Sequence, residues 1–181
     1  GHVHLYEINE ENLELCRRNL APFAGRVTIR REAVWNETGR TLRFGGYPDW
    51  EGRVNTGGTA LFERTGEHTV TTVALDEILQ EITCGGQRRL RLMKIDAEGS
   101  EWPVLLTSKR LGWVEEITGE YHEIGGAYDD LDTASVGLSG FRRYTRRELV
   151  FCLRSEGFRV RLLQDCSRWG RFFADRRGPA W

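Results

Sequence analysis

The stretch RLRLMKIDAEGSEWP, residues 89–103, decides the fold class of this 181-residue chain. Apolar side chains recur from Arg89 to Asp96, and this run predicts a strand that ends in an acidic turn. Ser100 then lies where the N-cap of a helix is expected, and Pro103 falls in the first turn of that helix, where its missing N–H costs nothing. A strand that passes directly into a helix is typical of an α/β fold.

The N-terminal residues show the same alternation of strand and helix. Val3 to Glu7 predicts a short strand, and Asn9 is the expected N-cap of a helix whose apolar stripe includes Leu13. Val27 to Arg30 predicts the next strand. Strand, helix and strand joined by short connections indicate a βαβ unit of a parallel sheet.

The rest of the chain adds a Gly-rich segment and a terminal hairpin. Glycines punctuate residues 36–68, which we interpret as a surface excursion of hairpins and turns. Further strands and helices are expected at Thr69–Val73, Leu75–Ile82, Val114–Glu120, from the capping box Thr145–Glu148 to Leu153, at Phe158–Leu163 and at Gly170–Asp175. The sequence therefore predicts a single α/β domain over residues 1–181, with a mostly parallel, Rossmann-like sheet and a C-terminal antiparallel hairpin.

Composition and charge favour some partners over others. The chain carries 26 Lys and Arg against 27 Asp and Glu, a net charge of −1, which gives no general reason to bind nucleic acid or an anionic membrane. The sequence shows no apolar run of membrane-spanning length and no signal peptide, and its four cysteines do not form a CxxC pattern. We therefore expect a cytoplasmic protein with free thiols.

Acidic residues close three of the predicted strands. Glu7, Asp96 and Glu120 each stand at a strand end, and the carboxyl ends of parallel strands meet at one edge of a sheet, where ligands bind. This arrangement favours a cationic or polyhydroxylated ligand. Glu7 suits the two hydroxyls of a ribose, although it could equally serve the dipole of the helix that follows.

His122 follows the same strand as Glu120 and is the candidate general base. Neighbouring carboxylates can orient an imidazole ring and raise its basicity, although a structural histidine is the alternative. No zinc-type or phosphate-loop motif occurs, so we predict no metal site. A site formed by His122 with Asp96 or Glu98 stays open as an alternative.

Several motifs, in this order, resemble the FkbM-type S-adenosylmethionine-dependent methyltransferases. The similar stretches are LYEINEENLELCRRNL at 5–20, Ala33-Val34, VALDEIL at 73–79, LMKIDAEGSE at 92–101 and GEYHE at 119–123. The resemblance implies a class I methyltransferase fold that binds S-adenosyl-L-methionine and methylates a hydroxyl of a small metabolite or a sugar. It implies roles for Glu7 at the ribose, Ala33 and Val34 beside the adenine, Asp96 beside the sulfonium, and Glu98 and His122, with Asp96, as catalytic residues at the acceptor.

One expected part of that family pattern is missing. The first strand and the Gly-rich turn of the family would precede Val3, where the sequence has only Gly1-His2. Upstream sequence, direct pairing of the two flanking strands, or a partner chain could complete the sheet, and a homo-oligomer stays open. A truncated, non-catalytic structural or assembly module is the alternative function. We expect residues 36–68 and 124–144 to recognise the small-molecule or glycan acceptor.

Overall fold

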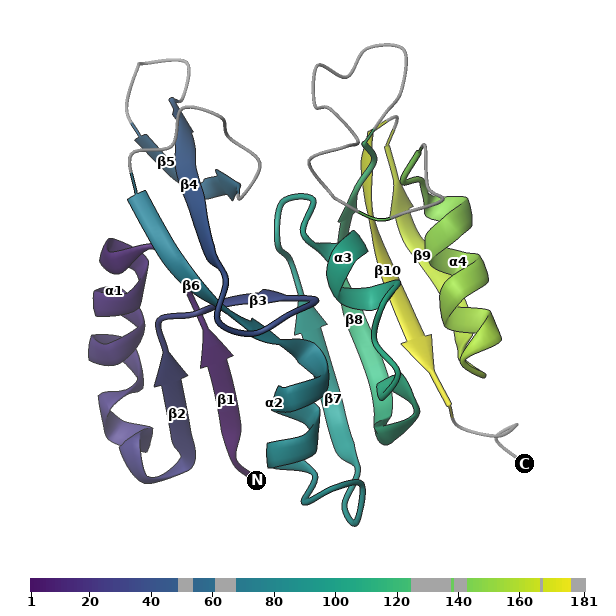
Figure 1. Cartoon of the computed structure of the whole chain (residues 1–181), viewed down its shortest axis with the longest axis horizontal. Coiled ribbons are helices and arrows are strands. Elements are labelled where there is room, and N and C mark those ends of the chain that lie inside the picture. Colours follow the sequence, from purple (N-terminus) through teal and green to yellow (C-terminus); the bar gives the residue numbers. More distant parts are fainter. Residues whose placement is uncertain (49–53, 61–67, 125–137, 139–142, 167, 177–181) are drawn as a thin grey trace.

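The computed structural model describes residues 1–48, 54–60, 68–124, 138, 143–166 and 168–176. Its helices are α1 (Glu10–Leu20), α2 (Leu75–Ile82), α3 (Glu101–Leu105) and α4 (Arg146–Ser155), with short 3-10 turns at Ala21–Arg26 and Leu111–Trp113. Its strands are β1 (Val3–Tyr6), β2 (Val27–Arg30), β3 (Ala33–Trp35), β4 (Thr41–Pro48), β5 (Val54–Ala60), β6 (His68–Ala74), β7 (Leu90–Ile95), β8 (Val114–His122), β9 (Arg159–Asp165) and β10 (Trp169–Asp175). The predicted α/β class is confirmed (Figure 1).

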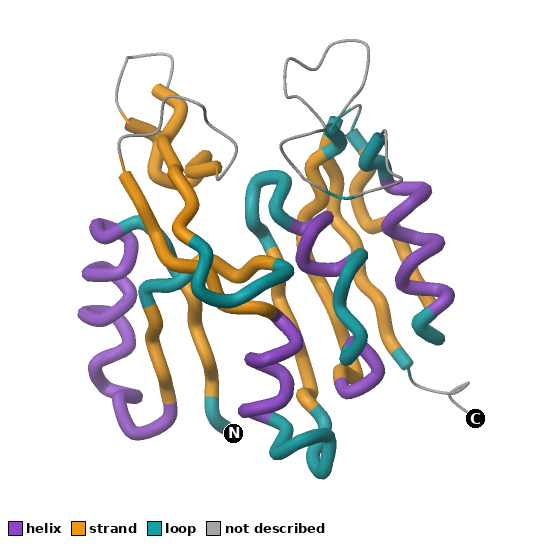
Figure 2. Tube along the Cα trace, in the orientation of Figure 1, coloured by secondary structure: helices purple, strands orange, loops and turns teal. Residues whose placement is uncertain are grey.

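The described strands form three sheets rather than the single sheet expected. Their orders are β1-β2, β7-β8-β10-β9 and β3-β6-β4-β5. Figure 2 shows the strands in orange. Three strand pairs are parallel and four are antiparallel, so the prediction of a mostly parallel sheet is wrong for these residues. The difference comes from the excursion, because β4 pairs antiparallel with both β5 and β6. The predicted C-terminal hairpin is confirmed by the antiparallel pair β9 and β10.

Strands β1 and β7 are both at the edge of their sheets. Within the described part of the chain, β1 pairs with β2 alone and β7 with β8 alone, so the two do not pair directly. Figure 1 shows both arrows running in the same direction, with α2 drawn in front of the space between them. Leu92 of β7 is 49% exposed and Val3 of β1 is 56% exposed. Buried parallel strands carry such side chains inside, so the exposed apolar residues mark these two edges as uncovered.

The main core joins β3 and α2 to the β7–β8 sheet. Trp35, Leu79 and Ile95 belong to one buried cluster, which continues through Ile117 and α4. A smaller cluster contains Ala33 of β3 and is packed against by Ile8, which follows β1. Strand β3 therefore contributes to both clusters, and its packing relates the N-terminal strands to the larger sheet.

The local sequence signals gave the helix starts. The Asn9 side chain accepts hydrogen bonds from the backbone N–H groups of Glu11 and Asn12, at 2.9 and 3.2 Å, which confirms the predicted N-cap of α1. Thr145 and Glu148 form the predicted capping box of α4. These signals depend on residues close in sequence, so tertiary packing leaves them unchanged.

Two predicted segments lie partly outside the described residues. Within 36–68, the strands β4 and β5 confirm a hairpin, while 49–53 and 61–67 are outside. Of the acceptor-side segment 124–144, only its ends and Leu138 are described, and Ile124 forms an isolated antiparallel bridge with Tyr144. All four cysteines are free thiols, and no described helix is long and apolar enough to cross a membrane.

Candidate functional site

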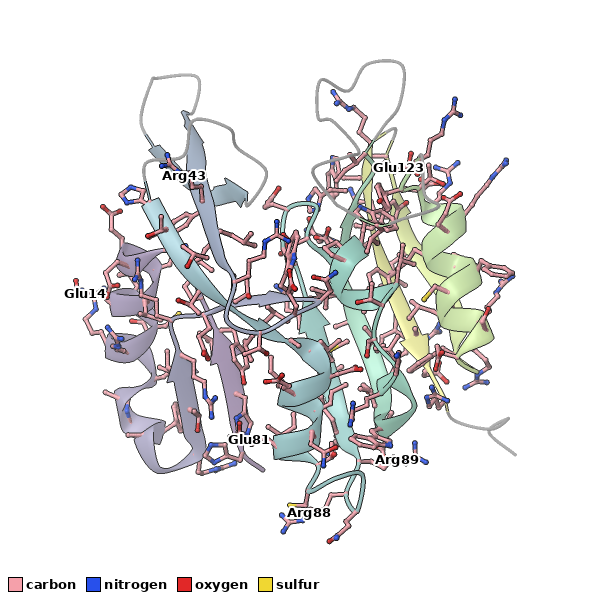
Figure 3. The ribbon with its side chains drawn as sticks, viewed as in Figure 1. Glu14, Arg43, Glu81, Arg88, Arg89 and Glu123 are labelled. Atoms are coloured by element: carbon pink, nitrogen blue, oxygen red, sulfur yellow. The ribbon has the colours of Figure 1, made fainter. Side chains whose placement is uncertain are left out.

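The carboxyl ends of β7 and β8 bring the acidic residues of two strands together. These strands pair in parallel, with Ile95 opposite Gly119, so the residues that follow, Asp96 and Glu120, lie at the same edge. A Cβ atom on Gly119 would lie 2.1 Å from the carbonyl oxygen of Ile95, and a residue without a side chain is therefore required at this close approach. Figure 3 shows Glu123 at this end of the molecule and Arg88 and Arg89, which precede β7, at the opposite end.

The turn after β7 is organised by Glu101. Its carboxylate accepts hydrogen bonds from the backbone N–H groups of Ala97 and Gly99, at 2.9 and 2.8 Å, and its side chain is 0% exposed. Glu98 and Gly99 both have positive φ angles, 47° and 97°, which makes this turn tight. Ser100 is the N-cap residue of α3, as predicted, but its side chain makes no capping hydrogen bond. Glu101 satisfies the amides of this turn instead.

His122 lies between two carboxylates of that turn. Its Nδ1 atom is 3.1 Å from Oε1 of the buried Glu101, and its Nε2 atom is 3.4 Å from Oε2 of Glu98. The indole N–H of Trp102 donates to the backbone carbonyl of His122 at 2.8 Å, which fixes the end of β8 against α3. The structure therefore brings the predicted residues Glu98 and His122 into contact.

The carboxylates around His122 stabilise positive charge on its ring. Burial by itself lowers the pKa of His122, but the hydrogen bond and charge of Glu101 and the charges of Glu98 and Asp96 raise it to about 9. This shift favours the protonated ring at neutral pH, and the role of His122 as a general base stays a prediction. Burial, followed by the negative charges of Asp96, Glu101 and Glu120, raises the pKa of Glu98 despite the opposing charge of His122.

The side chains of Asp96, Glu120 and His122 lie close together at the carboxyl ends of β7 and β8. One potential ligand atom from each lies within 4.8 Å of the other two. Asp96 also forms an ion pair with Lys94 at 3.3 Å, and Glu120 forms one with Arg171 at 2.8 Å. In the sequence, Glu120 was identified both as an acid that closes a strand and as a carboxylate next to His122. Glu120 and His122 lie two positions apart on β8 and therefore on the same face of that strand, while the approach of Asp96 depends on the pairing of β7 with β8.

The residues predicted to bind the cofactor lie at the end of β1 and in β3. The Glu7 carboxylate accepts hydrogen bonds from the backbone N–H of Asn9 at 2.8 Å and from the side-chain amide of Asn12 at 3.4 Å. These contacts are those expected of the alternative role, in which Glu7 supports the start of α1. Ala33 is buried and Val34 is half-buried, and Ile8, next to Glu7, packs on the cluster of Ala33. Glu7 and β3 are therefore close, while the ribose and adenine roles stay predictions.

Comparison of the sequence with models of known protein families identifies one matching family. The sequence model of the methyltransferase FkbM domain matches residues 1–159. Comparison with curated proteins and with solved structures gives no match. The matched residues include β1, the acidic turn after β7, and β8 with His122. They contain every residue of the candidate site except Arg171. The chain therefore belongs to the FkbM methyltransferase domain family.

Proposed function

We propose that this domain transfers a methyl group from S-adenosyl-L-methionine to a hydroxyl group of a small metabolite or a sugar. Membership of the FkbM methyltransferase family supports the reaction type. The observation that carries the proposal is that His122 contacts both Glu98 and Glu101 at the carboxyl ends of β7 and β8. In α/β proteins this edge of the sheet is where ligands bind.

The donor side of the site is assigned to β1, β3 and Asp96. The bound cofactor would supply a methyl group on a positively charged sulfur. Asp96 and Glu98 add negative charge at the edge, which favours a cation there. Glu7 would accept hydrogen bonds from the two ribose hydroxyls, and Ala33 and Val34 would cover the adenine. The half-buried Val34 offers apolar surface for the adenine ring, and Ala33 is packed behind it in the small core cluster.

The acceptor side is assigned to Glu98 and His122. A hydroxyl oxygen that attacks a methyl group must lose its proton, and a positioned base accelerates such a step by about 10²–10⁴-fold. Glu98 is the proton acceptor, because its carboxylate lies at the edge beside His122, 3.4 Å from its Nε2 atom. The imidazole ring of His122 contacts Glu101 through Nδ1 and Glu98 through Nε2, and it thereby fixes the position of Glu98. Orientation of donor and acceptor would supply much of the remaining rate enhancement.

Calorimetric titration with S-adenosylhomocysteine tests the donor assignment. We expect saturable binding by the full chain, and we expect Glu7→Ala to weaken it by about 10–100-fold, the effect of losing hydrogen bonds to a charged group. Glu14→Ala is the matched control, because Glu14 is an exposed residue of α1 (Figure 3). Equal affinities of wild type and Glu7→Ala would refute the ribose assignment. Absence of binding by a folded chain would favour the non-catalytic module.

A further inference from the structure

We infer that Asp96, Glu120 and His122 form a binding site for a divalent cation at the carboxyl ends of β7 and β8. Their potential ligand atoms lie within 4.8 Å of one another. Metal–oxygen and metal–nitrogen bonds of about 2.0–2.2 Å place the ligands of a bound ion roughly 3–4 Å apart. The pairing of β7 with β8 positions the backbone at this end of the sheet, and we expect side-chain rotation to bring the three atoms to that spacing.

The orientation of His122 supports this site independently of the distances. A histidine that binds a metal commonly donates its other ring N–H to a carboxylate, which fixes the ring. Here Nδ1 is 3.1 Å from the carboxylate of Glu101, which is fully buried and is itself held by the backbone amides of Ala97 and Gly99. The other ring nitrogen, Nε2, lies 3.4 Å from the carboxylate of Glu98, and an ion bound there would replace the proton that Nε2 carries. Glu98 thus adds a further negative group beside the site.

The side chains that now pair with two of the ligands are weak competitors. The ammonium of Lys94 neutralises Asp96 and the guanidinium of Arg171 neutralises Glu120, and the two basic side chains are 70% and 57% exposed. Exposed ion pairs of this kind contribute about 0–1 kcal/mol, and long side chains can turn into solvent. A doubly charged ion can therefore replace both contacts.

The donor atoms indicate the class of ion. Two carboxylates and one imidazole suit Mn²⁺, which accepts both oxygen and nitrogen ligands, better than Ca²⁺, which takes oxygen ligands almost alone. Three protein ligands leave coordination positions open. If the proposed methyl transfer is correct, an acceptor hydroxyl would occupy one of them and would lose its proton more readily.

Titration of the chelator-treated full chain with Mn²⁺ tests the site, with calorimetry for affinity and electron paramagnetic resonance for free Mn²⁺. We expect one ion per chain, and we expect Glu120→Gln to weaken binding at least tenfold. Glu115→Gln is the matched control, because Glu115 is an exposed residue of the same strand at its opposite end. Circular dichroism establishes that both variants are folded.

Three outcomes would overturn the cation site. In the first, millimolar Mn²⁺ stays free in the presence of the wild-type chain. In the second, Glu120→Gln and Glu115→Gln weaken Mn²⁺ binding equally. In the third, Glu120→Gln binds Mn²⁺ as tightly as the wild type. The titration with S-adenosylhomocysteine is a separate measurement. Binding of Mn²⁺ without binding of that nucleoside would refute the methyl-donor assignment and keep the cation site. The opposite pair of results would refute the cation site alone.

Discussion

Replacement of Glu101 by glutamine should destabilise the domain by about 2–4 kcal/mol, although the side chain keeps its size. Oε1 accepts from the amide of Ala97 and lies 3.1 Å from His122, while Oε2 accepts from the buried amide of Gly99. A glutamine retains one oxygen, so in its better orientation the new NH₂ group faces the N–H of Gly99. Leaving that amide unsatisfied costs about 1–3 kcal/mol, and loss of the charge weakens the two remaining hydrogen bonds.

Urea denaturation followed by tryptophan fluorescence measures this effect, because the buried indole of Trp102 is bonded to the end of β8. The midpoint should fall while the slope with denaturant stays the same, which would indicate unchanged burial. Glu115→Gln, an exposed control on β8, should change the free energy of unfolding by less than about 0.5 kcal/mol. A Glu101→Gln variant as stable as this control would show that Glu101 does not organise the turn.

Three further predictions concern β7, β8 and the thiols. Leu92→Ala should lower the free energy of unfolding by less than about 1 kcal/mol, because this side chain lies at an uncovered edge strand. Ile117→Ala, at a fully buried position, should lower it by about 2–5 kcal/mol in the same assay. Equal losses would mean that the β7 edge is covered. Gly119→Ala should lower the melting temperature, because the added methyl group would lie 2.1 Å from a carbonyl oxygen of β7, and an unchanged temperature would contradict that close approach. Burial, and then the charge of a nearby glutamate, raises the pKa of the Cys152 thiol to about 11. At pH 8 iodoacetamide should therefore modify the exposed Cys84 first, and the rate of modification at Cys152 should rise as the pH approaches 11. Mass spectrometry that finds Cys152 modified first would refute this prediction.

The sequence predicted elements well wherever the signal was local. The Asn9 cap, the capping box of α4 and the bounds of α2 are confirmed, because short-range hydrogen bonds and helical periodicity determine them. It was less successful where pairing between distant strands decides the result. The apolar run of β7 predicted a strand but not its partners, and β7 is an edge strand within the described residues.

The candidate site shows the same division. Asp96, Glu98 and His122 could be selected because an acidic strand end and a histidine beside acids are visible in sequence. The contact of Glu101 with His122, 21 positions away, depends on the register of β7 and β8. Asp96 approaches Glu120 and His122 for the same reason, whereas Glu120 and His122 lie two positions apart on β8. Roles that require the relative position of two strands are therefore the ones that sequence patterns leave open.

The separation of β1 from β7 has a consequence for the proposed donor site. Glu7 follows β1 and Asp96 follows β7, and these strands share no ladder in the described residues. Their relative position depends instead on side-chain packing, in which β3 places Ala33 in the cluster that Ile8 contacts and Trp35 in the main core with Ile95. A cofactor held by both carboxylates would add a direct connection between the two sheets. Its binding energy would then stabilise their arrangement, by about 2.7 kcal/mol at a ligand concentration one hundred times Kd.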